Sequence, residues 1–295
     1  MISRELVKKL RRIEIVTSRL AEDQLAGGYH SAFRGMGMTY SEARPYQPGD
    51  DVRFIDWNAS ARMNDAFVKV FTEEREMTVM IAVDLSASQQ FGTESAIKAE
   101  RIAEIAALLA FSAVQNGDRA GLLLFTDRIE RFVPPKKGRG HVMRVVTEIL
   151  NAKPEGRGTD LSLGIERLAQ LSKRRAVSFL ISDLFGPIDT RALRLAVQKH
   201  DLIPIEVLDR RELELPDVGL ALVEDLESGE LRELDTSDPL VREVYASSLR
   251  EEREERLRAF KRLRIDPITI ESGDEPSAKL AEYFRGRRRR ARSGL

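Results

Sequence analysis

The stretch from Met77 to Ser88, MTVMIAVDLSAS, places the strongest constraint on how this chain can fold. It begins with apolar and β-branched residues and changes abruptly to polar residues at Asp84. A short apolar run that ends in this way is typical of a buried strand of a parallel sheet. Ligands of open α/β sheets bind in the crevice at the carboxyl ends of such strands. We therefore expect Asp84, Ser86 and Ser88 to lie where a functional site belongs.

The oxygen-bearing side chains of this loop suit a hard cation such as Mg²⁺, which takes oxygen ligands. Two later segments have a related character. Residues 156–160, GRGTD, are a glycine-rich loop that ends in a hydroxyl and a carboxylate just before a helical pattern. Residues 178–183, SFLISD, are a second apolar strand that also ends in an acid. Three separate segments therefore carry oxygen atoms at the ends of regular elements.

Asp84-x-Ser86-x-Ser88, followed by Thr159 and then Asp183, resembles the metal-ion-dependent adhesion site of von Willebrand factor A domains. The resemblance implies that these five residues hold one divalent cation, Mg²⁺ or Mn²⁺, directly or through water. It also implies that the last coordination position accepts a carboxylate from a partner protein.

The sequence departs from that pattern at two positions. Leu184 follows the final Asp, where many such sites have Gly, and Gln89 follows the second Ser, where Met is common. We expect Leu184 to restrict access to the cation. A structural interpretation also stays open, in which Asp84 and its serines cap a strand-to-helix loop and Thr159 or Asp160 caps the next helix.

Apolar strands alternate with helical patterns of roughly ten residues or more along the centre of the chain, which predicts parallel βαβ units. The expected fold class is therefore α/β, with a Rossmann-like von Willebrand A domain as the resemblance implies. Its mostly parallel sheet would be flanked by helices, with an N-terminal helix and a loop-rich extension before it. A hairpin around Ser228-Gly229, a long helix from Asp238 and an edge strand at 266–271 are expected to follow.

Composition excludes several other classes. The chain has 295 residues, 42% of them hydrophobic, which is enough for a sizeable core. Lys and Arg number 48, as do Asp and Glu, so no net charge favours nucleic acid or a membrane surface. There is no cysteine, and no apolar run approaches the roughly 18 residues that a transmembrane helix needs. Because the N-terminus is too charged for a signal peptide, we expect a soluble cytoplasmic protein.

The first part of the chain has its own pattern. Apolar residues recur at helical spacing over residues 2–26 and predict an amphipathic helix. Residues 43–62, ARPYQPGDDVRFIDWNASAR, are punctuated by Pro and Gly, and we expect paired Arg and Asp side chains there, with Trp57 as a packing residue. This segment resembles the signature of the domain of unknown function 58 family, in which it precedes a von Willebrand A-like domain.

These patterns divide the chain into three parts. Residues 1–75 form the N-terminal helix and the signature extension, which we expect to pack on the main domain. Residues 76–285 form the von Willebrand A-like domain. Residues 286–295 form a basic tail, GRRRRARSGL, which we expect to be disordered.

The sequence offers no arrangement of residues that predicts catalysis. His30, His141 and His200 lie in loops or at helix ends away from any nucleophile motif, and no Walker motif or dinucleotide loop is present. The family resemblance implies instead an adaptor or co-chaperone of a MoxR-type AAA+ ATPase, monomeric on its own. Two alternatives stay open: a metal-dependent hydrolase in which the same loops activate water, and a metal-free scaffold that uses the N-terminal segment.

Overall fold

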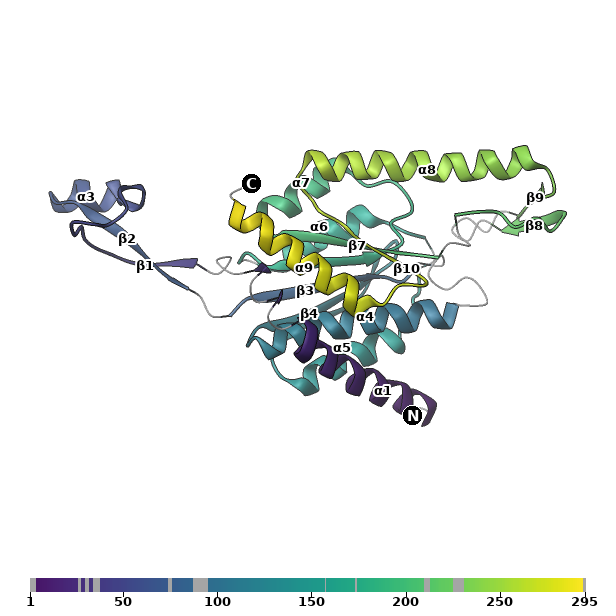
Figure 1. Cartoon of the computed structure of the whole chain (residues 1–295), viewed down its shortest axis with the longest axis horizontal. Coiled ribbons are helices and arrows are strands. Elements are labelled where there is room, and N and C mark those ends of the chain that lie inside the picture. The colour runs from purple at the N-terminus through teal and green to yellow at the C-terminus, as the bar shows by residue number, and fades with distance from the viewer. Residues whose placement is uncertain are drawn as a thin grey trace.

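A central sheet between two layers of helices forms the body of the molecule, and a two-stranded arm extends from it (Figure 1). This is a computed structural model. It describes residues 4–25, 28–29, 32–33, 38–73, 76–86, 95–156, 158–172, 174–209, 213–224 and 231–293. Within these ranges, no helix has the length and apolar character needed to cross a membrane.

The elements follow one another along the chain with these bounds. The first part contains α1 (Arg4–Leu20), the π-helical turn η1 (Ala21–Leu25), β1 (Met38–Pro45), the 3₁₀ turn η2 (Val52–Phe54), α3 (Trp57–Met63) and β2 (Phe67–Glu73). The body continues with β3 (Thr78–Asp84), α4 (Ser95–Gln115), β4 (Arg119–Phe125), β5 (Ile129–Lys136), α5 (Arg139–Leu150), α6 (Leu161–Leu171), β6 (Val177–Ser182), α7 (Thr190–Lys199) and β7 (Asp201–Leu208). The last part contains β8 (Leu220–Glu224), β9 (Leu231–Asp235), α8 (Pro239–Arg262), β10 (Ile268–Glu271) and α9 (Pro276–Ser293).

The sheet has the strand order β10-β7-β6-β3-β4-β5. All neighbouring strands are parallel except β5, which runs antiparallel to β4 at one edge. The predicted α/β fold with a mostly parallel sheet is therefore confirmed, as are the hairpin (β8 and β9) and the edge strand β10. Strand β3 lies between β4 and β6, so the end of the MTVMIAVD run is at the centre of the sheet.

Both faces of β3 are buried, which explains its continuous apolar sequence. Val79, Ile81 and Val83 contribute to one apolar cluster, together with residues of η1, α4, α5 and α9. Met80 and Ala82 point to the other cluster, together with residues of α6, α7 and α8. Helix α1 covers α4 on the outside of the first layer, as the amphipathic pattern of the N-terminus predicts.

The signature segment forms the arm, which extends away from the body in Figure 1. Strands β1 and β2 pair antiparallel, and η2 and α3 lie between them. Arg44 holds Asp50 through two bonds of 2.7 Å, and the Asp56 carboxylate caps α3. Asp50 and Asp56 thus find their partners within the arm. This corrects the expectation that the signature segment packs on the main domain.

Trp57 is a second correction within the arm. The sequence analysis expects it to be a packing residue, but it is 73% exposed at the first position of α3. Val52, Phe54 and Met63 of the same arm are also exposed. The arm is too thin to enclose these side chains, so they are left on its surface.

The basic tail differs from the expectation as well. Helix α9 continues through Ser293, whereas the sequence analysis predicts disorder from residue 286. The Arg287 guanidinium lies 4.9 Å from the centre of the Phe33 ring and pairs with Asp201, and Arg290 pairs with Asp266. Specific partners on the body therefore hold part of a segment that looks uniformly solvated in the sequence.

Candidate functional site at the ends of β3 and β6

Asp84 and Asp183 lie at the same edge of the sheet because their strands are neighbours in register. Strands β3 and β6 are parallel, with Val83 opposite Ile181. The residues that follow in the two strands, Asp84 in one and Ser182 and Asp183 in the other, therefore reach the same carboxyl edge of the sheet. Both carboxylates are fully buried. Two buried acids side by side are unusual, because a buried charge needs a compensating partner.

Ser182 links the two acids. Its hydroxyl donates to Asp84 Oδ2 at 2.7 Å, and the hydroxyl oxygen of Ser182 also lies 3.5 Å from Asp183 Oδ1. The backbone N–H of Leu184 donates to this hydroxyl at 2.8 Å, and the N–H of Ser86 donates to Asp84 Oδ1 at 2.9 Å. These bonds fix the orientation of the Asp84 carboxylate, and the N–H of Phe185 donates to Asp183 Oδ1 at 3.2 Å.

The electrostatics of Asp84 reflect this crowding. Burial, and next the negative charge of Asp183, raise the pKa of Asp84 to about 6. Hydrogen bonds from Ser86 and Ser182 favour the charged form but do not offset burial. A cation at this edge would relieve the repulsion, because an opposite charge nearby favours the ionised carboxylate.

The protein supplies one positive charge of its own. Lys98, in the first turns of α4, places its Nζ 3.4 Å from Asp183 Oδ2. The Lys98 side chain is only 8% exposed and that of Asp183 only 1%. The described part of the site therefore contains two carboxylates and one ammonium group in a region screened from water.

The loop that carries Thr159 lies against the carboxyl end of β4, which is the neighbour of β3 in the sheet. A Cβ atom at Gly156 would collide with Thr126 and Asp127, so only glycine allows this close approach. The Glu130 carboxylate accepts from the N–H of Gly156 at 2.9 Å and from the Thr126 hydroxyl at 2.7 Å. The loop is thereby held at the same edge of the sheet as Asp84.

Asp160 has the capping role that the structural interpretation predicts. Its side chain accepts from the N–H of Leu163 at 2.8 Å, and its own N–H donates to the Thr126 carbonyl at 3.2 Å. Thr159 itself, the residue before the cap, is half-buried. The described contacts do not join it directly to the two carboxylates, so its place in the metal set stays a prediction.

Ser86 is buried beside Asp84, whereas Ser88 lies outside the described residues. No three His, Cys, Asp or Glu side chains come together among the residues that the structure describes. A metal ion at this edge would therefore depend on hydroxyl oxygens in addition to the two acids. The available donors, carboxylates and serine and threonine hydroxyls, are those that Mg²⁺ and Mn²⁺ prefer, so the residues present fit such an ion.

Leu184 does not block the site in the way that the sequence analysis expects. Its φ is +60°, in the left-handed region where glycine is favoured, and its side chain is buried in the apolar cluster with α6 and α7. Glycine would adopt this backbone conformation without the strain that Leu184 bears. The unusual residue bears the strain but directs its side chain into the core.

The sequence does not predict Ser182 and Lys98, which lie beside the carboxylates, or Glu130, which holds the Gly156 loop. Ser182 had a usable signal, because it stands directly before Asp183 at a strand end. Lys98 and Glu130 had none, since Lys98 comes to the site only through the packing of α4 and Glu130 reaches the Gly156 loop only through the pairing of β5. His200, expected to be structural, bonds Ala176 and the Ala169 carbonyl near the opposite end of β6.

The family model described as "Protein of unknown function DUF58" matches residues 42–255, and the chain belongs to this family. Uncharacterized protein Rv1480 of Mycobacterium tuberculosis is 33% identical over 294 residues, which are 98% of this chain and 92% of that protein. Uncharacterized protein YeaD of Bacillus subtilis is 22% identical over 222 residues, 74% of this chain and 51% of YeaD.

Solved structures with a similar fold include von Willebrand factor A domains. A von Willebrand factor type A protein from Catenulispora acidiphila has a TM-score of 0.39 and 14% identity, over 75% of this chain and 44% of that one. The conserved hypothetical protein BatB from Bacteroides thetaiotaomicron has a TM-score of 0.47 and 13% identity, over 72% of this chain and 99% of that one.

Proposed function

We propose that the protein is an interaction module that binds a partner through a divalent cation, Mg²⁺ or Mn²⁺. Asp84, Ser86, Ser88, Thr159 and Asp183 would hold the ion, and a carboxylate of the partner would complete its coordination. The observation that carries the proposal is the pair of buried carboxylates, Asp84 and Asp183, linked by the Ser182 hydroxyl.

The charges at this edge favour an acidic partner. Two carboxylates and the Lys98 ammonium sum to one negative charge in the described part of the site. A divalent cation would change the sum to one positive charge, and a single carboxylate would neutralise it. Because uncompensated charge in a screened site is unfavourable, the loaded site should prefer an anionic ligand.

Binding, and not catalysis, is the function we propose for this edge. The hydrolase alternative needs a general base within hydrogen-bond reach of the metal-bound water. Lys98 is paired with Asp183, and His200 lies near the far end of β6. Neither is available for that role in the described part of the chain.

We further propose that the partner is a MoxR-type AAA+ ATPase, for which this protein acts as an adaptor. The support is the signature segment that is typical of the family. The exposed arm also supports a scaffold role, because Trp57, Phe54 and Met63 offer apolar contact area outside the body. An adaptor could use the arm and the cation at different contacts.

Isothermal titration with Mg²⁺ and with Mn²⁺ tests the metal. The wild type should bind one ion, and the isosteric Asp84→Asn and Asp183→Asn variants should bind at least about tenfold more weakly. Asp56→Asn, which changes the helix cap of α3 in the arm, should bind like the wild type. If the wild type and Asp84→Asn gave the same heat of binding, or if neither gave any, the proposed metal site would be wrong.

Capture of the purified ATPase tests the partner. Immobilised protein should retain it in Mg²⁺ and lose it in EDTA, and Asp183→Asn should reduce retention in Mg²⁺. Capture that ignores both the chelator and the Asp183 substitution would contradict a cation-mediated contact and favour the arm.

A further inference from the structure

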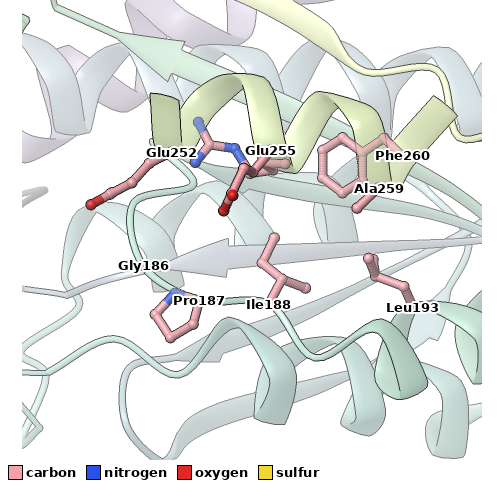
Figure 2. A pocket seen from close by; sticks show the side chains of 9 residues that line it. Gly186, Pro187, Ile188, Leu193, Glu252, Glu255, Ala259 and Phe260 are labelled. Carbon is pink, nitrogen blue, oxygen red and sulfur yellow. The ribbon is translucent and has the colours of Figure 1, made fainter. Parts of the chain in front are cut away.

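A pocket of about 450 Å³ lies between α8 and the loop that follows Asp183. Its floor is apolar and comes from that loop and α7, through Pro187, Ile188 and Leu193 (Figure 2). The opposite wall is α8, which presents Glu252 and Glu255 (Figure 2). The volume lies within the roughly 300–1,000 Å³ of pockets that enclose small ligands.

A buried guanidinium with spare donor capacity lines this pocket. The Arg256 side chain is only 6% exposed, and its terminal nitrogen donates to Glu206 at 3.0 Å. Its Nε has no hydrogen-bond acceptor among the described residues. Because Arg256 lines the pocket, an acceptor oxygen of a ligand that reaches its guanidinium would form a charge-assisted hydrogen bond.

Glu206 has no capacity left to satisfy that donor. Its two oxygens accept bonds from Nε and Nη2 of Arg253, from Arg256 and from the Thr269 hydroxyl. One carboxylate thus faces two guanidinium groups, and the Glu271 carboxylate also acts on Arg253. A neutral acceptor such as a carbonyl oxygen suits the Arg256 guanidinium.

The rim of the pocket carries negative charge. Ion pairs on α8 join Arg250 to Glu243 and Arg258 to Glu254, but in the described part of the chain none engages Glu252 or Glu255. Both of these carboxylates are exposed beside the pocket. A cationic group of the ligand would therefore find two acceptors at the rim.

We propose that this pocket binds a peptide segment of a partner protein that presents an apolar side chain next to Lys or Arg. The apolar side chain fills the floor, a backbone carbonyl accepts from the Arg256 guanidinium that lines the pocket, and the basic side chain pairs with Glu252 and Glu255. A fatty chain lacks the cation and a polyamine lacks the acceptor, so a peptide is the class that meets all three features. The site is separate from the metal proposal and needs no ion.

Methyl-resolved NMR of the full chain tests the pocket with defined probes. Acetyl-Leu-Lys-amide, titrated to about 10 mM, should give saturable shifts of the Ile188 and Leu193 methyl groups. Acetyl-Leu-Glu-amide and acetyl-Gly-Lys-amide should bind about fivefold more weakly or not at all, the scale of one exposed ion pair. Equal binding of the three peptides, or no shift at these methyl groups, would overturn the proposal.

Variants separate the pocket from the rest of α8. Ala259→Trp fills the pocket and should abolish the shifts. The double variant Glu252→Gln/Glu255→Gln keeps the shape and should remove the preference for Lys over Glu in the second position, whereas Glu254→Gln should keep it. Unchanged selectivity in the double variant would refute the charge argument even if Ala259→Trp fails to fold. Binding should be the same with EDTA, so loss of the metal proposal would leave this one intact.

Discussion

Lys98 Nζ lies 3.4 Å from Asp183 Oδ2, with both side chains buried at the carboxyl edge of the sheet. A fixed ammonium group therefore occupies the neighbourhood in which we propose a divalent cation. It balances one of the two acids when no metal is bound and repels a metal ion that arrives.

Replacement of Lys98 by Met should tighten metal binding. The substitution keeps the length and apolar stem of the side chain and removes a positive charge close to the ion. Loss of this charge should raise the affinity for Mg²⁺ by about tenfold or more. Titration calorimetry measures the change, and the exposed Lys199→Met serves as the matched control. An affinity equal to that of the wild type would mean that Lys98 and the ion do not share one site.

Asp84 should give the metal-free protein a distinctive pH dependence. Its pKa is about 6 in the folded protein against an ordinary 3.8, so the folded state binds the proton more tightly than the unfolded state between these values. Stability from this group is present at pH 4, declines as the pH rises to about 6, and stays lower above that.

The isosteric Asp84→Asn variant lacks this titration. In EDTA its unfolding free energy should exceed that of the wild type by on the order of 3 kcal/mol at pH 7.5, and the difference should shrink towards pH 4. Urea unfolding at several pH values measures the gap. A gap that does not vary with pH would show that Asp84 titrates normally.

Arg287 should contribute to stability although it lies in a run of arginines. Its guanidinium contacts the Phe33 ring and pairs with Asp201, and its side chain is only 24% exposed. Arg287→Ala should lower the unfolding free energy by about 1–2 kcal/mol. Arg288→Ala, an exposed neighbour, should have an effect below about 0.5 kcal/mol. If Arg287→Ala and Arg288→Ala changed stability equally in thermal melts, the tail would be solvated as the sequence predicts.

Glu206 should be among the most sensitive polar residues of the body. It is buried between Arg253 and Arg256, and its replacement by Gln would leave two guanidinium groups facing each other. A loss of about 3 kcal/mol is expected, because removal of one partner of a buried ion pair leaves uncompensated charge. Urea unfolding checks this value, and a loss below about 1 kcal/mol would show that water screens the cluster.

Trp57 should matter for partner binding and not for stability. With 73% of its surface exposed, Trp57→Ala should change the unfolding free energy by less than about 0.5 kcal/mol. Circular dichroism measures this, since the substitution removes the single tryptophan. If the arm contacts the ATPase, capture should fall in the same variant. A large loss of stability would mean that the arm packs on the body in solution.

Local pattern alone predicted the mostly parallel α/β sheet and the strand ends at which its acids lie. The unbroken apolar runs before Asp84 and Asp183 required strands buried on both faces, and parallel strands bring their carboxyl ends to one edge. The glycine-rich loop before Asp160 is also found at that edge, where Gly156 touches Thr126.

Tertiary structure decided which groups meet those acids and which segments remain outside the core. Lys98, Ser182 and Arg287 acquire their partners through contacts between elements far apart in the chain. The exposure of Trp57 follows from an arm that pairs with itself. Hydrophobic periodicity reports the face of one element at a time, whereas ion pairs and burial depend on the neighbour against which that face is packed.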